Sequence, residues 1–276
     1  MIKDIVVNLS VREDGGNVGD FAVSVAEALD AHIAGIAFVF DPIVPVSGTG
    51  YIPAEVIDTQ LADNQAAAKA AIDRFAAATS RAGLSAEPVT LAASAAGAGD
   101  QFARIARRFD LAIIGQAEPE GGTVEELIVE SALFESGRPV IVVPYIQKGP
   151  LKLDRVMVCW DGSRQAARAI ADAMPILEKA GKVELVIVTN ERGKQDEIEG
   201  ADIGQHLARH GLTVDVKRIS DGNIDVADAL LSHVADSGTD FIVMGGYGHS
   251  RLREFVLGGV THSILQSMTA PVLLSH

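Results

Sequence analysis

Cysteine is almost missing from this chain of 276 residues, since Cys159 is the only one. A single cysteine excludes an internal disulfide and a metal site of the CxxC kind, and it favours a reducing compartment. No apolar run reaches the roughly 18 residues of a membrane-spanning helix. The start, MIKDIVVNLS, lacks the charged segment and long apolar stretch of a signal peptide. We therefore expect a cytoplasmic protein.

Basic residues are also scarce. Lys and Arg number 23 against 37 Asp and Glu, which gives a formal net charge of −14. Binding to nucleic acid or to anionic lipid needs a basic face, so this charge argues against both partners. A small anion can still bind where positive groups gather locally. With 48% hydrophobic and only 5% aromatic residues, the composition is typical of a globular α/β protein.

The best-known catalytic and nucleotide-binding motifs are missing too. The chain has no GxSxG motif, no GxxxxGK[ST] phosphate loop and no GxGxxG dinucleotide loop. No nucleophile and base stand together in the sequence, so we name no catalytic residue. His206 and His210 have the i, i+4 spacing of some metal ligands. Because no third ligand is nearby, we interpret them as surface residues and assign no metal ligand.

An internal repeat organises the rest of the sequence. KDIVVNLS near the start is answered by LDRVMVCWDGS, DLAIIGQ by DFIVMGG, and RPVIVVPY by APVLLSH. The pairs keep their order at a separation far longer than a solenoid repeat. We therefore predict two homologous domains, residues 1–147 and 152–276.

Each half alternates short, nearly continuous apolar runs with longer helical patterns. Strands that are covered by helices on both faces have this appearance. The sequence therefore predicts an α/β fold of two doubly wound domains, each a five-stranded parallel sheet with helices on both faces. In the first half, residues 41–60 predict a surface loop before an Ala-rich helix over 62–83. In the second half the predicted strands are 154–160, 183–189, 213–219, 240–245 and 271–275.

Both halves end in an apolar strand. An open sheet edge promotes association with other chains. We therefore expect the two terminal edges, PVIVVPY and APVLLSH, to pair inside the chain and form a pseudo-dimer.

The segment GGYGHSRLREFVLGGVTHS, residues 245–263, follows directly on a predicted strand. Ligands of such sheets bind at the carboxyl ends of the strands, where the strand order reverses. Glycines permit close approach to the backbone, so the N–H groups of this loop can converge on an anion. VTHSILQSM then predicts a helix whose first turn would offer further N–H groups to the same anion.

The glycine spacing resembles that of a known family. From Gly245, through Gly248, to Gly258, the sequence follows the pattern G-x2-G-x9-G-G-V-T. Nucleotide-binding members of the universal stress protein family carry G-x2-G-x9-G-[ST] before a short helix and a final strand. The segment VMVCWDGS also resembles this family, in which an Asp closes the first strand. The whole chain therefore resembles a tandem, two-domain universal stress protein of the UspA-like type, which implies antiparallel pairing of the halves.

The resemblance implies ATP with Mg²⁺, or another adenine nucleotide, as the ligand. Asp161 would contact the adenosine moiety, and Val188 would line the adenine pocket. Gly259 replaces the usual hydroxyl residue after the third glycine, so Thr261 or Ser250 would have to supply a hydroxyl. His249 and Ser250 are further candidate phosphate contacts. The residues implied to wrap the phosphates are Gly245, Gly248, Gly258, Gly259, Val260 and Thr261.

The first half departs from this pattern. Ser10 stands where Asp161 stands in the second half, and the loop after IIGQ has the sequence AEPEGGTVEELIVES. Carboxylates crowd this loop and would repel phosphate. We expect a domain that keeps the fold without a phosphate site. The acidic residues are Glu118, Glu120, Glu125 and Glu126.

Simpler interpretations of the same residues stay open. The glycines can form tight turns without a ligand, and Asp161 can be a turn or helix N-cap residue. The basic residues between positions 249 and 262 can form a solvated face.

For the whole protein we expect a stress- or energy-responsive regulatory protein that binds ATP. Hydrolysis would be slow at most, because no general base or arginine finger can be named. A homodimer of two chains is a further expectation, and the sequence names no protein partner. Two other functional classes stay open: a nucleotide-independent interaction module and an adenylyl-transfer enzyme.

Overall fold

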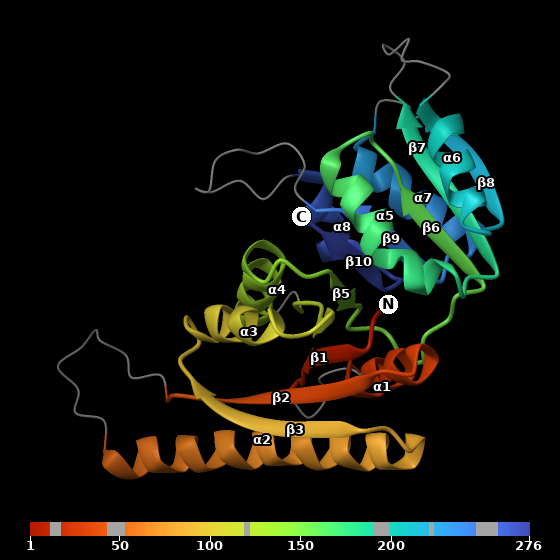
Figure 1. Ribbon diagram of the computed structural model, residues 1–276. Coiled ribbons are helices and arrows are strands. Elements are labelled where there is room, and N and C mark those ends of the chain that lie inside the picture. The colour runs from red at the N-terminus through yellow and green to blue at the C-terminus, as the bar shows by residue number, and fades with distance from the viewer. Residues whose placement is uncertain (12–17, 43–52, 119–121, 190–198, 221–223, 247–258) are drawn as a thin grey trace.

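The computed structural model describes residues 1–11, 18–42, 53–118, 122–189, 199–220, 224–246 and 259–276. Strands and helices alternate along both halves (Figure 1). The first half comprises β1 (Asp4–Asn8), α1 (Val18–Leu29), β2 (His32–Phe40), α2 (Ala54–Ala82), β3 (Ala86–Ala93), α3 (Ala98–Ala106), β4 (Leu111–Gly115), α4 (Thr123–Glu135) and β5 (Val140–Val143). The second half comprises β6 (Arg155–Cys159), α5 (Arg164–Leu177), β7 (Lys182–Thr189), α6 (Glu199–Arg209), β8 (Val214–Ser220), α7 (Val226–Ser237), β9 (Phe241–Gly245), α8 (Gly259–Ser267) and β10 (Val272–Ser275).

The described strands form one ten-stranded sheet in the order β3-β2-β1-β4-β5-β10-β9-β6-β7-β8. Neighbouring strands run parallel within each half, and the halves meet where β5 pairs with β10 in the antiparallel sense. We call this pairing the seam. The predicted α/β class, with five parallel strands in each doubly wound half, is confirmed. The predicted pairing of the two terminal strands is confirmed as well.

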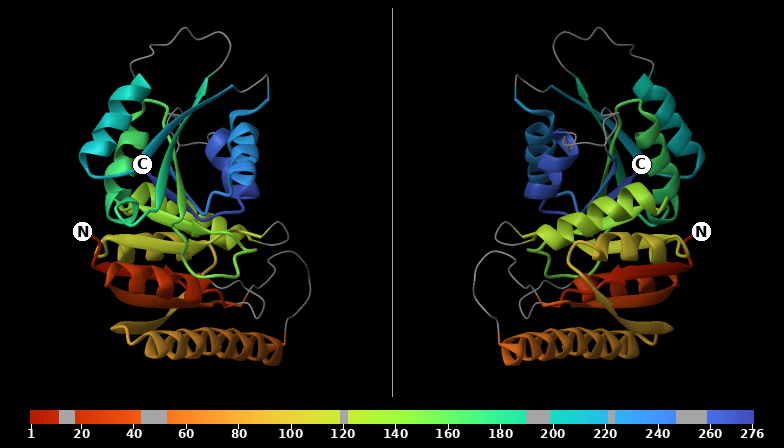
Figure 2. Two further views of the ribbon diagram at one scale, coloured as in Figure 1. Left: turned by 90° about the vertical axis from the view of Figure 1, so that its right-hand side faces the viewer. Right: turned by 90° about the vertical axis from the view of Figure 1, so that its left-hand side faces the viewer.

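Helices cover both faces of the sheet (Figure 2). One face packs against α1, α2, α5 and α6, and the other against α3, α4, α7 and α8. Successive strand residues alternate between these two cores, as Ile5 and Val7 on one face and Val6 on the other show. The seam keeps the alternation, because Leu273 lies opposite Ile141 and both belong to the first core. Each hydrophobic core therefore runs through both halves.

An aspartate in the internal repeat holds the start of the first strand in each half. The Oδ2 atom of Asp110, before β4, accepts hydrogen bonds from the N–H groups of Lys3 and Asp4 at 2.8 and 3.1 Å. The Oδ2 atom of Asp240, before β9, accepts one from the N–H of Arg155 at 2.9 Å. The Asp shared by DLAIIGQ and DFIVMGG therefore has a structural role in both halves.

The predicted strands of the second half agree with β6 to β10 to within one residue at either end. The loop predicted over residues 41–60 is wrong in its last part, because α2 begins at Ala54. Pro53 precedes this helix with φ −59° and ψ 139°, and proline is compatible with a helix start. No Gly or Pro follows before Gly83, so nothing interrupts the helix. Residues 43–52 lie outside the described part of the chain.

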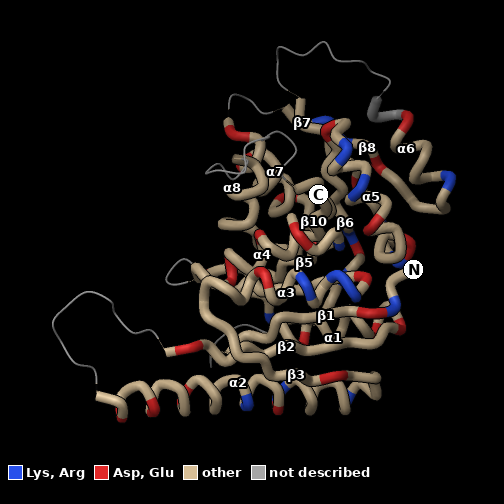
Figure 3. Tube along the Cα trace, turned by 60° about the vertical axis from the view of Figure 1, so that its left-hand side comes forward, with Lys and Arg blue, Asp and Glu red and all other residues tan. Residues whose placement is uncertain are grey.

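Charged residues of both signs lie on elements of both halves, as Figure 3 shows for the described residues. Acidic residues exceed basic ones in the whole sequence, with 37 against 23. Within the described ranges no helix combines the length and the apolar character needed to cross a membrane.

Candidate functional site

β6 is the strand at which the strand order of the second half reverses. It pairs with β7 on one side and with β9 on the other, and the sheet continues to β8 and to β10 respectively. Open α/β sheets bind ligands at the carboxyl end of such a switch point. Asp161 follows β6, Gly245 closes β9 and Gly259 opens α8. The structure thus places three of the sequence-predicted residues on the elements that surround this point.

Asp161 is exposed and forms part of the turn between β6 and α5. Its Oδ1 atom accepts a hydrogen bond from the N–H of Ser163 at 2.9 Å. Ser163 in turn is the N-cap of α5, since its Oγ accepts from the N–H of Ala166 at 3.1 Å. The turn role that the sequence left open for Asp161 is therefore observed. Its exposed carboxylate also lies where a ligand at the switch point would be.

Gly245 has a packing role that sequence reasoning missed. A Cβ atom at this position would lie 2.6 Å from the backbone N of Ala166 and 2.7 Å from the carbonyl C of Gln165. Backbone atoms in the first turn of a helix cannot move aside cheaply, so only glycine allows β9 to approach α5 this closely. This contact brings the start of α5 next to the end of β9.

The centre of the glycine-rich loop lies outside the described residues. Gly248, His249, Ser250 and Gly258 belong to this part. Their predicted phosphate contacts therefore stay predictions.

α8 is described from its first residue. Gly259 is exposed, Val260 is half-buried and Thr261 is buried, with 4% of its surface exposed. The first N–H groups of a helix have no intrahelical acceptor. The exposed start of α8 therefore offers backbone donors at the carboxyl edge of the sheet, whereas Thr261 is enclosed by protein.

Val188, near the carboxyl end of β7, is half-buried on the face covered by α7 and α8. Cys159, the last residue of β6, packs into the same core. Burial, and to a smaller extent the Asp161 carboxylate, raises the pKa of the Cys159 thiol to about 12. A thiol with this pKa is neutral at physiological pH and is a poor nucleophile. Among the described residues, Val188 and Cys159 therefore give this side of the switch point apolar, uncharged side chains.

Trp160 lies on the opposite face, against the core under α5 and α6. Its Nε1 atom is buried and has no hydrogen-bond partner among the described residues.

The rings of His206 and His210 contact each other edge to face, with centroids 4.8 Å apart. Across the described ranges, no group of three or more His, Cys, Asp or Glu is arranged to hold a metal ion.

Comparison with known proteins identifies the family. Residues 152–276 match the family model described as the Universal stress protein family. Residues 152–276 are therefore a universal stress protein domain. A universal stress protein from Archaeoglobus fulgidus DSM 4304 has the same fold over both halves, with a TM-score of 0.75, 17% identity, and coverage of 99% of this chain and 95% of that one. The first half is therefore a second domain of the same fold.

Two curated relatives carry the same family name. Universal stress protein Slr1230 of Synechocystis sp. is 27% identical over 175 residues, which cover 60% of this chain and 57% of that protein. Universal stress protein YxiE of Bacillus subtilis is 40% identical over 52 residues, which cover 19% of this chain and 35% of that protein. The matches span little more than half of the first relative and about a third of the second, so function has to be argued from the site.

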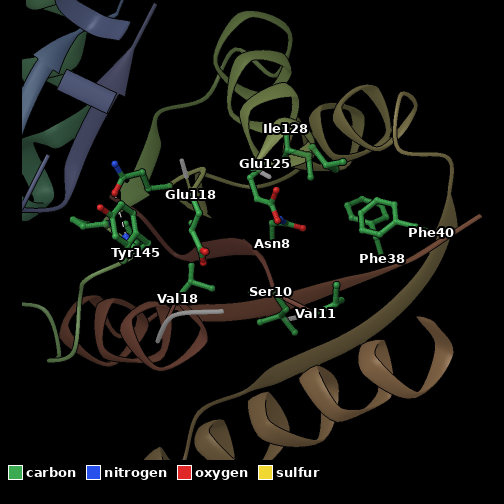
Figure 4. A pocket seen from close by; sticks show the side chains of 17 residues that line it. Asn8, Ser10, Val11, Val18, Phe38, Phe40, Glu118, Glu125, Ile128 and Tyr145 are labelled. Atoms are coloured by element: carbon green, nitrogen blue, oxygen red, sulfur yellow. Dashed lines mark hydrogen bonds between the residues drawn. The ribbon is translucent and has the colours of Figure 1, made fainter. Parts of the chain in front are cut away.

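The first half has a cavity at the corresponding carboxyl edge (Figure 4). There β1 pairs with β2 and β4, as β6 pairs with β7 and β9 in the second domain. The cavity lies at the ends of these strands and beside the first turn of α4. The side chains that give it its chemical character are Asn8, Ser10, Phe38, Phe40, Glu118 and Glu125.

The sequence pointed to some of these residues for another reason, as an acidic loop that would repel phosphate. Of the acidic residues it named, Glu118 and Glu125 line the cavity, Glu126 is exposed on α4, and Glu120 lies outside the described residues. It missed Asn8. The available signal was the amide side chain that ends β1, DIVVN, directly after three apolar residues.

Proposed function

We propose that this chain is a tandem universal stress protein that binds ATP, or another adenine nucleotide, in its second half and acts as a stress- or energy-responsive regulatory protein. One observation carries the proposal: an exposed Asp161 lies at the switch point formed by β6, β7 and β9, on the sheet edge from which α8 begins. In this proposal residues 152–276 are the nucleotide-binding domain. Residues 1–147 are a partner domain that has no phosphate site. We expect the protein to act in the cytoplasm and two chains to form a homodimer.

The described residues fit the parts of an adenine nucleotide. The exposed Asp161 carboxylate can accept hydrogen bonds from the hydroxyl groups of adenosine, and the half-buried Val188 can contact the base. The N–H of the exposed Gly259 can donate to phosphate, because anions are stabilised at helix N-termini. The loop that holds Gly248 and Gly258 would supply the remaining backbone donors.

Mg²⁺ fits this site as a companion of the nucleotide rather than as a resident ion. The described residues include no cluster of three or more His, Cys, Asp or Glu suited to a metal. In nucleotide sites Mg²⁺ is usually held by one or two carboxylates together with the phosphates. When bound, the ion would neutralise part of the phosphate charge.

The same residues support binding without fast turnover. The Cys159 thiol is neutral because of its raised pKa, and Asp161 already accepts a hydrogen bond within its own turn. We expect steady-state ATP hydrolysis far below the roughly 1 to 100 per second that is typical of phosphoryl-transfer enzymes. Hydrolysis within that range, abolished by a change at Asp161, would show that a catalytic group has been missed.

Isothermal titration with ATP and Mg²⁺ on the full chain tests the proposal. Asp161→Ala removes a charge-assisted hydrogen bond and should weaken affinity by roughly ten- to a hundredfold. Gly248→Val should weaken it further, because a β-branched side chain would occupy the phosphate path and resist a positive φ. Ser10→Ala, at the equivalent place in the first half, is the matched control and should leave affinity unchanged.

Three results would point to other functions. Two nucleotides per chain, or equal sensitivity to Ser10→Ala and Asp161→Ala, would mean that the first half binds nucleotide as well. No binding by ligand-free protein would favour a nucleotide-independent interaction module. Release of pyrophosphate in the presence of an acceptor would favour an adenylyl-transfer enzyme.

A further inference from the structure

The seam places the last helix of each half beside the end of the fourth strand of the other half. Gln116 follows β4, and its N–H donates to the carbonyl oxygen of Val143 in β5 at 2.7 Å. Gly246 follows β9, and its N–H donates to the carbonyl oxygen of Ser275 in β10 at 2.8 Å. β5 and β10 pair in the antiparallel sense (Figure 1). Gln116 therefore reaches the last turn of α8, and Gly246 lies against the last turn of α4.

Gly246 is held on three sides. Besides the bond of its N–H to Ser275, its carbonyl oxygen accepts a hydrogen bond from Nδ1 of His276 at 3.1 Å. On the third side, the buried Leu133 side chain occupies the space that a side chain at position 246 would need, because a Cβ there would lie 2.9 Å from Cδ2 of Leu133. The Phe134 ring contacts the His276 ring edge to face, with centroids 4.8 Å apart. Two neighbouring residues of α4 in the first half therefore hold the backbone that follows β9 in the second half.

The first half also holds α8. The Nε2 atom of Gln116 donates to the carbonyl oxygens of Leu265 and Gln266, in the last turn of α8, at 2.8 and 3.1 Å. The last carbonyl groups of a helix have no intrahelical donor, so this amide satisfies acceptors that α8 cannot satisfy itself. Position 246, the equivalent place of the second half, has no side chain to return such a bond. A side chain of the first half therefore fixes the carboxyl end of α8.

Electrostatic interaction links α4 to α8 as well. Burial and the neighbouring Glu126 carboxylate raise the pKa of Glu130 on α4, and His262 on α8 acts in the opposite direction. An effect of His262 on this carboxyl requires the two side chains to lie close together across the seam. α4 therefore approaches α8 near its first turn, in addition to contacting Gly246.

We propose that Leu133 and Gln116 of the first half position the end of β9 and α8 for nucleotide binding, so that the first half sets the affinity of the site in the second. Both are positioning residues, which act through the backbone segments that they hold. Backbone N–H groups bind phosphate only where each donor lies roughly 2.7 to 3.2 Å from its acceptor, so a small displacement of these segments weakens binding. The role of both residues rests on the proposed nucleotide site.

Isothermal titration of the full chain with ATP and Mg²⁺ measures this coupling. Leu133→Ala should weaken ATP affinity by about tenfold, and Gln116→Ala by about threefold. Leu133→Met keeps the side-chain volume and should restore affinity to within about twofold of the unmodified chain. Val129→Ala is the matched control, because Val129 lies one helical turn before Leu133, is 4% exposed and packs into the same core. It should change ATP affinity by less than about twofold.

Amide hydrogen exchange of the ligand-free chain tests the positioning without nucleotide. In Leu133→Ala the amide of Gly246 should exchange about tenfold faster relative to the amides of β6, which report global opening. In Val129→Ala this ratio should stay unchanged. Coupling between sites is reciprocal, so saturating ATP should slow exchange in the last turn of α4 of the unmodified chain.

The two measurements separate failure of this inference from failure of the proposed function. No ATP binding by the unmodified chain, together with faster exchange at Gly246 in Leu133→Ala, would overturn the proposed function and still support the positioning of β9 by α4. ATP affinity that Leu133→Ala leaves unchanged, or equal effects of Leu133→Ala and Val129→Ala on affinity or exchange, would overturn the inference. If Leu133→Ala does not fold, unchanged ATP affinity in Gln116→Ala has the same meaning.

Discussion

The two halves of this protein share one backbone plan and differ at the edge that binds ligands. In each half the first strand pairs with the second and the fourth. At the carboxyl ends, however, the first half presents Asn8 and Ser10 where the second presents Cys159 and Asp161. The apolar strands and the contacts at their opposite ends hold the fold, so residues at the strand ends are free to carry different chemistry.

The seam is asymmetric as well. Gln116 follows β4 and Gly246 follows β9, at equivalent places. The Nε2 atom of Gln116 donates to the carbonyl oxygens of Leu265 and Gln266 at 2.8 and 3.1 Å. At Gly246 a Cβ atom would lie 2.9 Å from Cδ2 of Leu133, so glycine leaves room for that side chain. Each half therefore contacts the other through different groups.

The largest stability effect is expected at a buried pair that only the second half contains. Glu184 of β7 lies opposite Met157, whereas Ala34 lies opposite Val6 at the equivalent place of the first half. Only 3% of Glu184 is exposed, and its Oε2 atom lies 2.6 Å from Nε2 of His233.

His233→Ala should lower the free energy of unfolding by about 3 to 5 kcal/mol, because it leaves the buried Glu184 side chain without its partner. Urea denaturation followed by circular dichroism measures this change. Adding Glu184→Ala, which copies the residue of the first half, should recover part of the loss. Losses that simply add would show that the contact between the two side chains contributes nothing.

The next effect concerns Cys159, the counterpart of Asn8. With a pKa of about 12, its thiol should react with a disulfide reagent at pH 8 roughly a thousandfold more slowly than free cysteine, whose pKa is about 8.5. The rate should rise with pH up to the pKa, because only the thiolate reacts. Labelling at the rate of free cysteine in the folded protein would contradict the burial of this residue. Denatured protein provides the reference rate.

Gly245 and Gly115 close equivalent strands and form a matched pair. Gly245→Ala should destabilise the protein by about 3 kcal/mol, because the new Cβ would meet backbone atoms of α5 at 2.6 Å. Gly115→Ala should change stability by less than about 1 kcal/mol, since its Cβ would meet only Val18 Cβ at 3.9 Å. Urea denaturation of both variants makes the comparison. Equal losses would mean that the approach of α5 to β9 is not what requires glycine.

The smallest effect is expected at the seam. Gln116 is buried, with 6% exposed, and Gln116→Ala removes its bonds to the last turn of α8 and to the N–H of Tyr145. The expected loss is about 1 to 2 kcal/mol. Gln147→Ala, in the connection between the halves, removes a local bond to the carbonyl of Gly149 and should cost less than about 0.5 kcal/mol. Hydrogen exchange should show faster opening of α8 only in the Gln116 variant.

Much of the fold could be predicted because its signals are local. Apolar runs located β6 to β10 to within one residue, and the repeated Asp110 and Asp240 marked equivalent strands. The start of α2 was predicted wrongly, since the Pro and Gly residues before it suggested a longer loop. A proline at a helix start and one inside a loop have the same local sequence signal, and only the chain that follows distinguishes them.

The candidate site was less predictable. Asp161 was recognised from a family pattern, but its bond to Ser163 depends on how the turn closes. Asn8 was not recognised as a cavity residue, because an amide at a strand end has many roles and the rest of the lining includes residues of α4, more than a hundred residues away.

The amino-acid sequence by itself determined the doubling of the domain, the order of strands and helices, and the family, because side-chain type and spacing carry these properties along a single stretch of chain. Tertiary structure alone decided that β5 and β10 join in a register that continues both cores. It also decided why position 245 requires glycine and that Asn8 lines a cavity. These properties depend on distances between segments far apart in sequence, and such distances are set only when the helices pack on the sheet.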